Sequence, residues 1–121
     1  MAIPTFAGDL SGDGSIIGFS WGLTTADPTG AHVEQLAWSD RTFTAVGTWG
    51  GATITIEGSN DGVNFVPLSD AAGAADATAA ANKAMTVVEL TRFIRPKLTT
   101  VGSGATVTAM LVARKATPMR T

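Results

Sequence analysis

The chain has 121 residues, a formal net charge of −2, one histidine and no cysteine. This length supports a single domain, and the absence of cysteine excludes disulfide bonds, thiolate metal sites and a cysteine nucleophile. A metal centre built from several histidines is excluded by the single His32, no apolar run reaches the roughly 18 residues of a membrane span, and we expect no signal peptide.

Charge is distributed unevenly along the chain. Residues 1–82 contain nine acidic residues and one basic residue, a balance of −8, whereas residues 83–121 contain seven basic residues and one acidic residue, a balance of +6. One interpretation is that the basic part docks on an acidic protein surface. The other is that the two parts pair within one fold or across a homo-oligomer. We expect no nucleic acid partner, because no aromatic residues alternate with the basic ones.

The first third of the chain contains turn residues and two candidate strands. Residues 1–15, rich in Gly and Asp, are predicted to form an extended N-terminal arm. Residues 16–23 alternate as a strand, and residues 24–31 contain Asp-Pro followed by Gly, which is typical of a turn. Residues 32–38 fit either a helical or a strand pattern, and we favour a strand because no helix caps flank them.

The middle of the chain shows the clearest alternation. Residues 41–49 and 52–59 have β-branched residues at a period of two, which indicates strands. Asn60-Asp61-Gly62 predicts a hairpin turn leading into a strand over 63–68. The small, polar residues 69–83 are predicted to form a loop, because they have no apolar stripe.

The last third predicts three more strands, over 84–90, 92–100 and 105–114. Pro96 cannot donate to a ladder, so the strand over 92–100 is predicted to be an edge strand or to contain a bulge. In total we expect an all-β fold, an antiparallel β-sandwich or jelly roll of seven or eight short strands. The domain would span residues 16–115, followed by an extended tail over 116–121.

Residues that suggest metal binding or catalysis are better explained by structure. Residues 8–14 begin like a calcium loop but lack the required Glu at position twelve, where Ser20 stands. The oxygen-bearing side chains of residues 58–62 are those that a tight turn needs. His32 has no serine and acid placed to complete a triad, and the acidic residues fall in turns or on outward strand faces. We therefore expect no metal, no cofactor and no enzymatic activity.

The three tryptophans are expected to anchor the core or an interface, rather than to form a platform for sugars. Trp49, beside Gly50-Gly51, is the one that we expect to be partly exposed.

Two segments of the chain carry a family resemblance. The run Asp40-Arg41-Thr42-Phe43, followed by GTWGGATITIEGSNDGVNFVPL at 47–68, resembles a family of small tailed-bacteriophage virion proteins. The later TRFIRP at 91–96 and the Thr/Val-rich strand over 105–114 match the same family in the same order. The resemblance covers residues 38–114, whereas the first 37 residues match nothing in it.

The resemblance implies a capsid decoration (cement) protein of the β-sandwich type. Such a protein would be made in the bacterial host cytoplasm, form a homotrimer and bind the major capsid protein on the capsid surface of the virion. A GSNDG turn also occurs in carbohydrate-binding sandwiches, so the alternatives are a carbohydrate-binding module or a tail or connector subunit. The loop over 70–82 is one expected contact region; the individual candidate contact residues, including Asn64 for a sugar site, are Ile3, Pro4, Phe6, Trp49, Asn60, Asp61, Asn64, Arg92, Arg95 and Lys97.

Overall fold

The computed structural model describes the chain apart from residues 13–14, 35–37, 72–75, 90 and 116–121. The predicted tail over 116–121 therefore lies outside the described residues. Within the described part the chain forms ten strands and no helix. They are β1 (Phe6–Asp9), β2 (Ile16–Thr24), β3 (Val33–Glu34), β4 (Trp38–Thr48), β5 (Thr53–Ser59), β6 (Val66–Pro67), β7 (Thr78–Ala79), β8 (Lys83–Thr86), β9 (Phe93–Thr100) and β10 (Thr106–Lys115).

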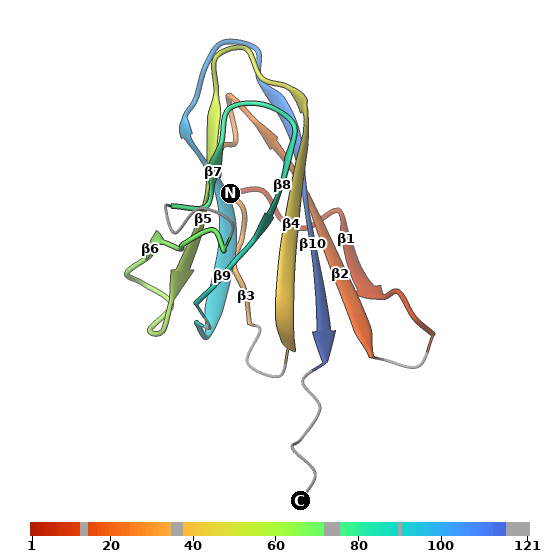
Figure 1. Cartoon of the computed structure of the whole chain (residues 1–121). Coiled ribbons are helices and arrows are strands. Elements are labelled where there is room, and N and C mark those ends of the chain that lie inside the picture. Colours follow the sequence, from red (N-terminus) through yellow and green to blue (C-terminus); the bar gives the residue numbers. More distant parts are fainter. Residues whose placement is uncertain (13–14, 35–37, 72–75, 90, 116–121) are drawn as a thin grey trace, which may run out of the picture.

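The strands form two antiparallel sheets (Figure 1). The first sheet has the order β1-β2-β10-β4-β8, and the second has the order β3-β9-β5-β6, with β7 also paired to β5. These observations confirm the expected all-β class and the antiparallel pairing. The strands number ten, two more than the upper limit of the expected range, because several are only two residues long.

One apolar core lies between the sheets and takes residues from both. The inward positions of β10, Val107, Ala109 and Leu111, are fully buried, as the alternation predicts. Trp21 is also fully buried, and its ring lies 6.0 Å from that of Phe43. The indole N–H of Trp21 donates to a backbone carbonyl at 2.9 Å, so burial of this side chain leaves no donor unpaired.

The structure changes the prediction for the N-terminal arm. Phe6–Asp9 pair with β2, so this part of the expected arm over 1–15 is an edge strand of the first sheet. Ala2 is buried and exchanges hydrogen bonds with residues 29 and 31. The sequence does not reveal this strand because its Gly and Ala residues give no alternation of apolar and polar side chains.

Three other predicted strands are shorter in the structure. The strand over 63–68 is reduced to β6, because the turn before it continues through residue 64. The strand over 84–90 corresponds to β8, which ends at Thr86. The strand over 32–38 is reduced to β3, and residues 35–37 lie outside the described part.

Pro96 lies in a strand that is not at an edge. β9 has β5 on one side and β3 on the other, so it is not an edge strand. The other predicted alternative is confirmed, because β9 contains a bulge at Thr99, between its pairs with Ile54 and Thr53. The Pro96 carbonyl accepts from the N–H of Gly30 at 2.9 Å. Since the amide and carbonyl of a strand residue point the same way, the missing N–H faces Gly30 and leaves the β5 ladder intact.

The two faces of β10 offer a direct test of this arrangement. We expect Leu111→Ala to lower the free energy of unfolding by about 2–5 kcal/mol, because it leaves a cavity in the core. The neighbouring Val112→Ala, on the opposite face and 41 % exposed, should cost about 1 kcal/mol or less. Urea unfolding followed by tryptophan fluorescence measures both, and equal losses would contradict the assigned faces.

Candidate functional site

The turn after β5 is closed by its own side chains. The Ser59 hydroxyl donates to Asp61 Oδ1 at 2.8 Å and accepts from the N–H of Gly62 at 2.9 Å. Asp61 Oδ1 also accepts the N–H groups of Val63 and Asn64, each at 2.8 Å, and its Oδ2 accepts from Asn64 Nδ2 at 2.7 Å. The backbone hydrogen bonds from Asn64 and Val63 hold the pKa of Asp61 well below its usual range. The side-chain oxygens of Ser59 and Asp61 therefore stabilise the turn through hydrogen bonds within it.

The two segments that carry the family resemblance meet at this turn. Asn60 Oδ1 accepts from the backbone N–H of Arg92 at 3.1 Å. Beneath it, a Cβ on Gly58 would lie only 2.4 Å from Thr91 Oγ1, so the close approach of the two segments requires glycine there. Residues 57–65 and 91–97 thus form one packed unit of the second sheet.

Two arginines of this unit have different surroundings. Arg95 is largely buried, with its Nη2 2.9 Å from Glu57 Oε1 and its guanidinium carbon 3.8 Å from the centre of the Phe65 ring. Arg92 is about half exposed and pairs with Glu34 at 2.6 Å. These predicted contact residues are therefore brought together, but their charged groups bind acidic side chains of the same chain.

His32 completes this cluster on the outer side of the second sheet. Its ring lies 4.9 Å from that of Phe93 and 5.4 Å from that of Phe65. Contacts with two phenylalanines explain the exposed histidine as a packing residue of the cluster.

Trp49 is not brought together with the other residues expected to bind a sugar, which lie in the turn after β5. Trp49 precedes β5 and donates its indole N–H to Asn82 Oδ1 at 2.9 Å, whereas Asn60 and Asp61 follow β5. A strand of seven residues places these two ends about 23 Å apart. Trp49 is half-buried against the core, in agreement with the expected partial exposure.

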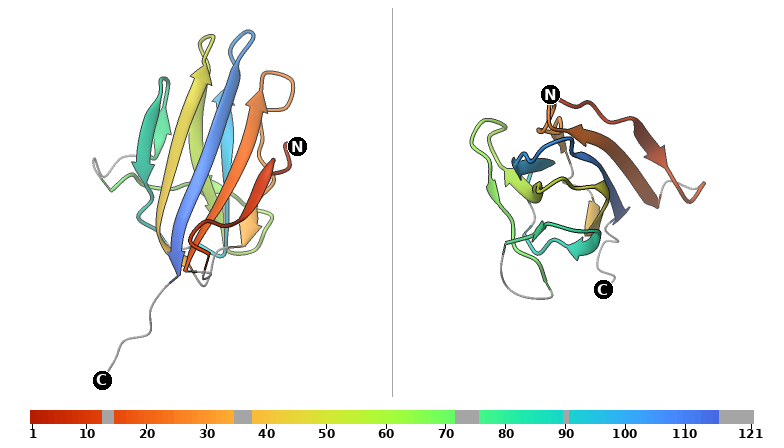
Figure 2. Two further views of the ribbon diagram at one scale, coloured as in Figure 1. Left: turned by 90° about the vertical axis from the view of Figure 1, so that its right-hand side faces the viewer. Right: turned by 90° about the horizontal axis from the view of Figure 1, so that it is seen from above.

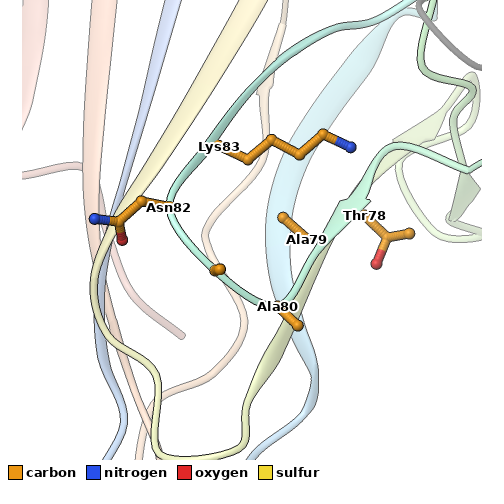
Figure 3. Close-up of a pocket in the computed structure, with 6 residues that line it drawn as sticks. Thr78, Ala79, Ala80, Asn82 and Lys83 are labelled. Carbon is orange, nitrogen blue, oxygen red and sulfur yellow. The ribbon is translucent and has the colours of Figure 1, made fainter.

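The loop over 70–82, of which 72–75 lie outside the described residues, leads into β8. Asp70 is buried and lies 3.4 Å from Lys83 Nζ. A hollow of about 350 Å³ is lined by residues 78–83, but the side chains of Asn82 and Lys83 point in different directions and do not converge (Figure 3). This hollow has no set of polar groups placed to hold a ligand.

Strand β4 carries a buried cation behind this loop. The Arg41 side chain is 3 % exposed and donates to the backbone carbonyl of Glu89. Burial lowers the pKa of Arg41, whereas the Glu89 carboxylate raises it. That carboxylate accepts from both the N–H and the hydroxyl of Ser69, which lower the pKa of Glu89. These hydrogen bonds join the segments at Ser69 and Glu89 to each other and to β4.

The remaining candidate residues lie elsewhere on the surface. Ile3 is exposed and Pro4 half-buried, both just before β1. Lys97 is half-buried on β9, where its backbone forms an antiparallel β-bridge with Thr29. Phe6 lies on the outer side of the first sheet and is 46 % exposed.

The outer side of the first sheet has a surface that sequence reasoning missed. The strand register aligns its outward residues in rows, and four neighbouring rows contain no charged residue, whereas the next row along β10 contains Arg114, opposite Ile16. We call this surface the uncharged face, and Figure 2 (left) shows the sheet that carries it in full view. Its rows are Gly8-Gly18-Val112-Thr42-Thr86, Phe6-Ser20-Met110-Thr44-Ala84, Gly22-Thr108-Val46 and Thr24-Thr106-Thr48.

Large apolar side chains of the uncharged face are open to solvent. Phe6, Val46, Met110 and Val112 are each between 41 % and 46 % exposed. Leu10, which follows β1 and covers Gly18, adds a fifth exposed apolar side chain at the rim. Between Leu10, Phe6 and β10 lies an apolar hollow of about 330 Å³. Depletion of charge together with exposed apolar side chains is characteristic of protein interface cores.

No family model, curated protein or solved structure matches the chain. Among the residues that the structure describes, no three acidic or histidine side chains are grouped so as to hold a metal ion. The same residues include no helix with the length and apolar character needed to cross a membrane. The uncharged face is therefore the best-supported candidate site.

The two arginine pairs predict different losses of stability. We expect Arg95→Ala to lower the free energy of unfolding by about 3 kcal/mol, because it leaves the buried Glu57 without its partner. Arg92→Ala, which breaks an exposed pair, should cost between about 0 and 1 kcal/mol. Urea unfolding measures both variants, and equal costs would show that burial of the Arg95 pair contributes nothing.

The Asp61 turn predicts a dependence of stability on pH. Because folding lowers the pKa of this carboxyl, its contribution is complete above the unfolded pKa of about 4 and decreases as the pH falls further. Wild type should therefore lose stability toward acid relative to Asp61→Asn in urea titrations at a series of pH values. Asp76→Asn, an exposed carboxyl outside the turn, controls for the change in net charge. A constant difference between wild type and Asp61→Asn at all pH values would contradict the assigned role.

Proposed function

We propose that this chain is a non-enzymatic structural protein of a tailed-bacteriophage virion. In this proposal it is a capsid decoration protein that binds the outer surface of the major capsid protein lattice and stabilises the head. The observation that carries the proposal is the uncharged face, since a protein that acts by contact with other proteins needs a broad surface that can be desolvated at little cost. A jelly-roll arrangement of the two sheets is part of the same proposal.

The packing of the resemblance segments supports the phage assignment. Residues 57–65 and 91–97 are separated in sequence but meet through Asn60, Gly58 and Thr91. The resemblance also includes β4 and β10, which carry Val46, Met110 and Val112, so the proposed partner surface lies partly within it.

The proposed activity rests on contact area and repetition. A capsid lattice offers many equivalent sites, so weak contacts of individual subunits add up through avidity. The decoration protein would stabilise the head by bridging neighbouring capsid subunits, without any covalent step. A tail or connector subunit would use the same kind of surface, and the location of binding on the particle distinguishes the two.

A sugar-binding function receives less support from the geometry. Trp49 and the Asn60 turn lie at opposite ends of β5, and the Asp61 oxygens are bonded within the turn. A single sugar cannot contact both groups.

The function is tested on bacteriophage heads from which this chain has been removed. Addition of the purified chain should raise the temperature at which the heads rupture and release DNA, up to a saturating stoichiometry. Met110→Glu should weaken rebinding at least tenfold, because it places a charge on a surface that the assembly buries. Val63→Glu, which is 79 % exposed beside the Asp61 turn, is the matched control and should rebind like wild type.

Binding only to tails or connectors would favour the alternative location. An unchanged rupture temperature at saturating protein would refute the decoration role.

A further inference from the structure

We propose that a second copy of this chain covers the uncharged face, in a dimer whose twofold axis lies between the first sheets of the two copies and runs parallel to β10. This inference goes beyond the proposed function, because it concerns the free protein and requires no shell. On a head the capsid surface would replace the second copy, so the two partners compete for the same face. The argument rests on the strand order, on the relief of the face, on its lack of charge and on its area.

The strand order determines which residues would meet. β10 is the central strand of the first sheet, with β2 and β1 on one side and β4 and β8 on the other. Rotation about an axis parallel to β10 places the β10 strands of the two copies over each other. The same rotation places β1 of each copy over β8 of its partner, and β2 over β4.

The relief of the face is complementary under this rotation. Phe6, which protrudes on β1, would lie over Ala84 on β8 of the partner, because both belong to the same row. Val46 on β4 would lie over Gly22 on β2, a position where a Cβ would meet nothing within 4 Å. Large side chains of one half thus face small ones of the other half. Met110, in the central strand, would meet its own counterpart near the axis.

The absence of charge favours a second copy over a partner of opposite charge. An isologous contact brings each group near an identical set, so charged residues on the face would repel one another. The four rows contain none; Arg114, in the next row along β10, has an interaction within its own chain and would lie opposite its own counterpart only at the end of the contact. An acidic or basic partner would find no complementary charge here to select it.

The area of the face suits a dimer of moderate affinity. Strands spaced about 4.8 Å apart and rows about 6.6 Å apart give the face roughly 500 Å² per copy. The pair would bury roughly 1,000 Å² in total, which is near the lower limit for a specific interface. We therefore expect a dissociation constant in the micromolar range. Two copies complete the arrangement, in contrast to the trimer that the family resemblance implies.

Sedimentation of the purified chain over a concentration series tests the oligomeric state. Wild type should shift from monomer to dimer in the micromolar range, Met110→Glu should remain monomeric, and Val63→Glu should behave like wild type. A chain that stays monomeric to millimolar concentration, or that forms a trimer, would overturn the proposal. Circular dichroism spectra that match wild type would show that the variants are folded.

Crosslinking tests the axis, because the chain contains no cysteine of its own. Phe6→Cys with Ala84→Cys should give a covalent dimer with a bismaleimide reaching about 10 Å, the spacing of packed sheets. Within one chain these positions lie at opposite edges of the sheet, roughly 19 Å apart, so the linker should not join them. Either substitution alone should give little crosslinked dimer, because position 6 of one copy faces position 84 of the other, and a single variant has a cysteine at only one of these two positions.

The outcomes separate this proposal from the proposed function. Heads that bind a strictly monomeric chain would overturn the dimer and leave the decoration role intact. A chain that forms the dimer with the expected crosslinks but does not bind heads in any state would overturn the decoration role and leave the dimer intact. A dimer that persists in Met110→Glu without the Phe6–Ala84 crosslink would show that the copies pair through another surface.

Discussion

The structure depends on the pairing of β10 with strands on both sides. β10 hydrogen-bonds to β2 and to β4 along almost its full length, so its side chains can point only into the core or away from it. Val107, Ala109 and Leu111 fill the space between the sheets, which fixes Thr108, Met110 and Val112 on the outside. The core and the uncharged face are therefore consequences of one alternation. A register slip of one residue would exchange them.

The two sheets treat their outer sides differently. The second sheet covers its outer side with Arg95, Phe65 and Phe93, and its ion pairs close within the chain. Three of the pairs, Arg92–Glu34, Arg95–Glu57 and Lys83–Asp70, each join a base from the end of the chain to an acid from the first part. These pairs show that the opposite charges of the two parts of the sequence are at least partly combined within one fold. Among the described residues, the four rows on the outer side of the first sheet carry no charged side chain, and this is the side that we propose to contact partners.

Local chemistry was sufficient to predict several elements. The alternation of residues over 105–114 predicted β10, and Asn60-Asp61-Gly62 predicted the turn that the Asp61 side chain closes. Pairing between distant segments cannot be predicted from any short window of sequence. Pro96 is accommodated inside a sheet only because the segment at Gly30 lies on the side of its missing N–H, and Phe6 belongs to a strand only because β2 offers it a partner.

The uncharged face could not be predicted for the same reason. Its members come from five strands between residues 6 and 112, and each of them alone resembles an ordinary outward strand residue. Only the register brings Phe6, Gly22, Val46, Ala84 and Met110 onto one surface. The sequence instead drew attention to the charged and turn-forming residues, which the structure uses to hold the second sheet together.

The most direct test of the central claim is hydroxyl-radical footprinting of the methionines, because their oxidation follows solvent exposure. Met110 lies on the uncharged face, Met1 lies outside the rows of that face and is 70 % exposed, and Met85 is buried in the core. Comparison of the dilute free chain with the assembled chain should show strong protection of Met110 on assembly, continued oxidation of Met1 and low oxidation of Met85 in both states. Equal oxidation of Met110 in the free and assembled chain would show that the uncharged face is not the surface through which this protein works.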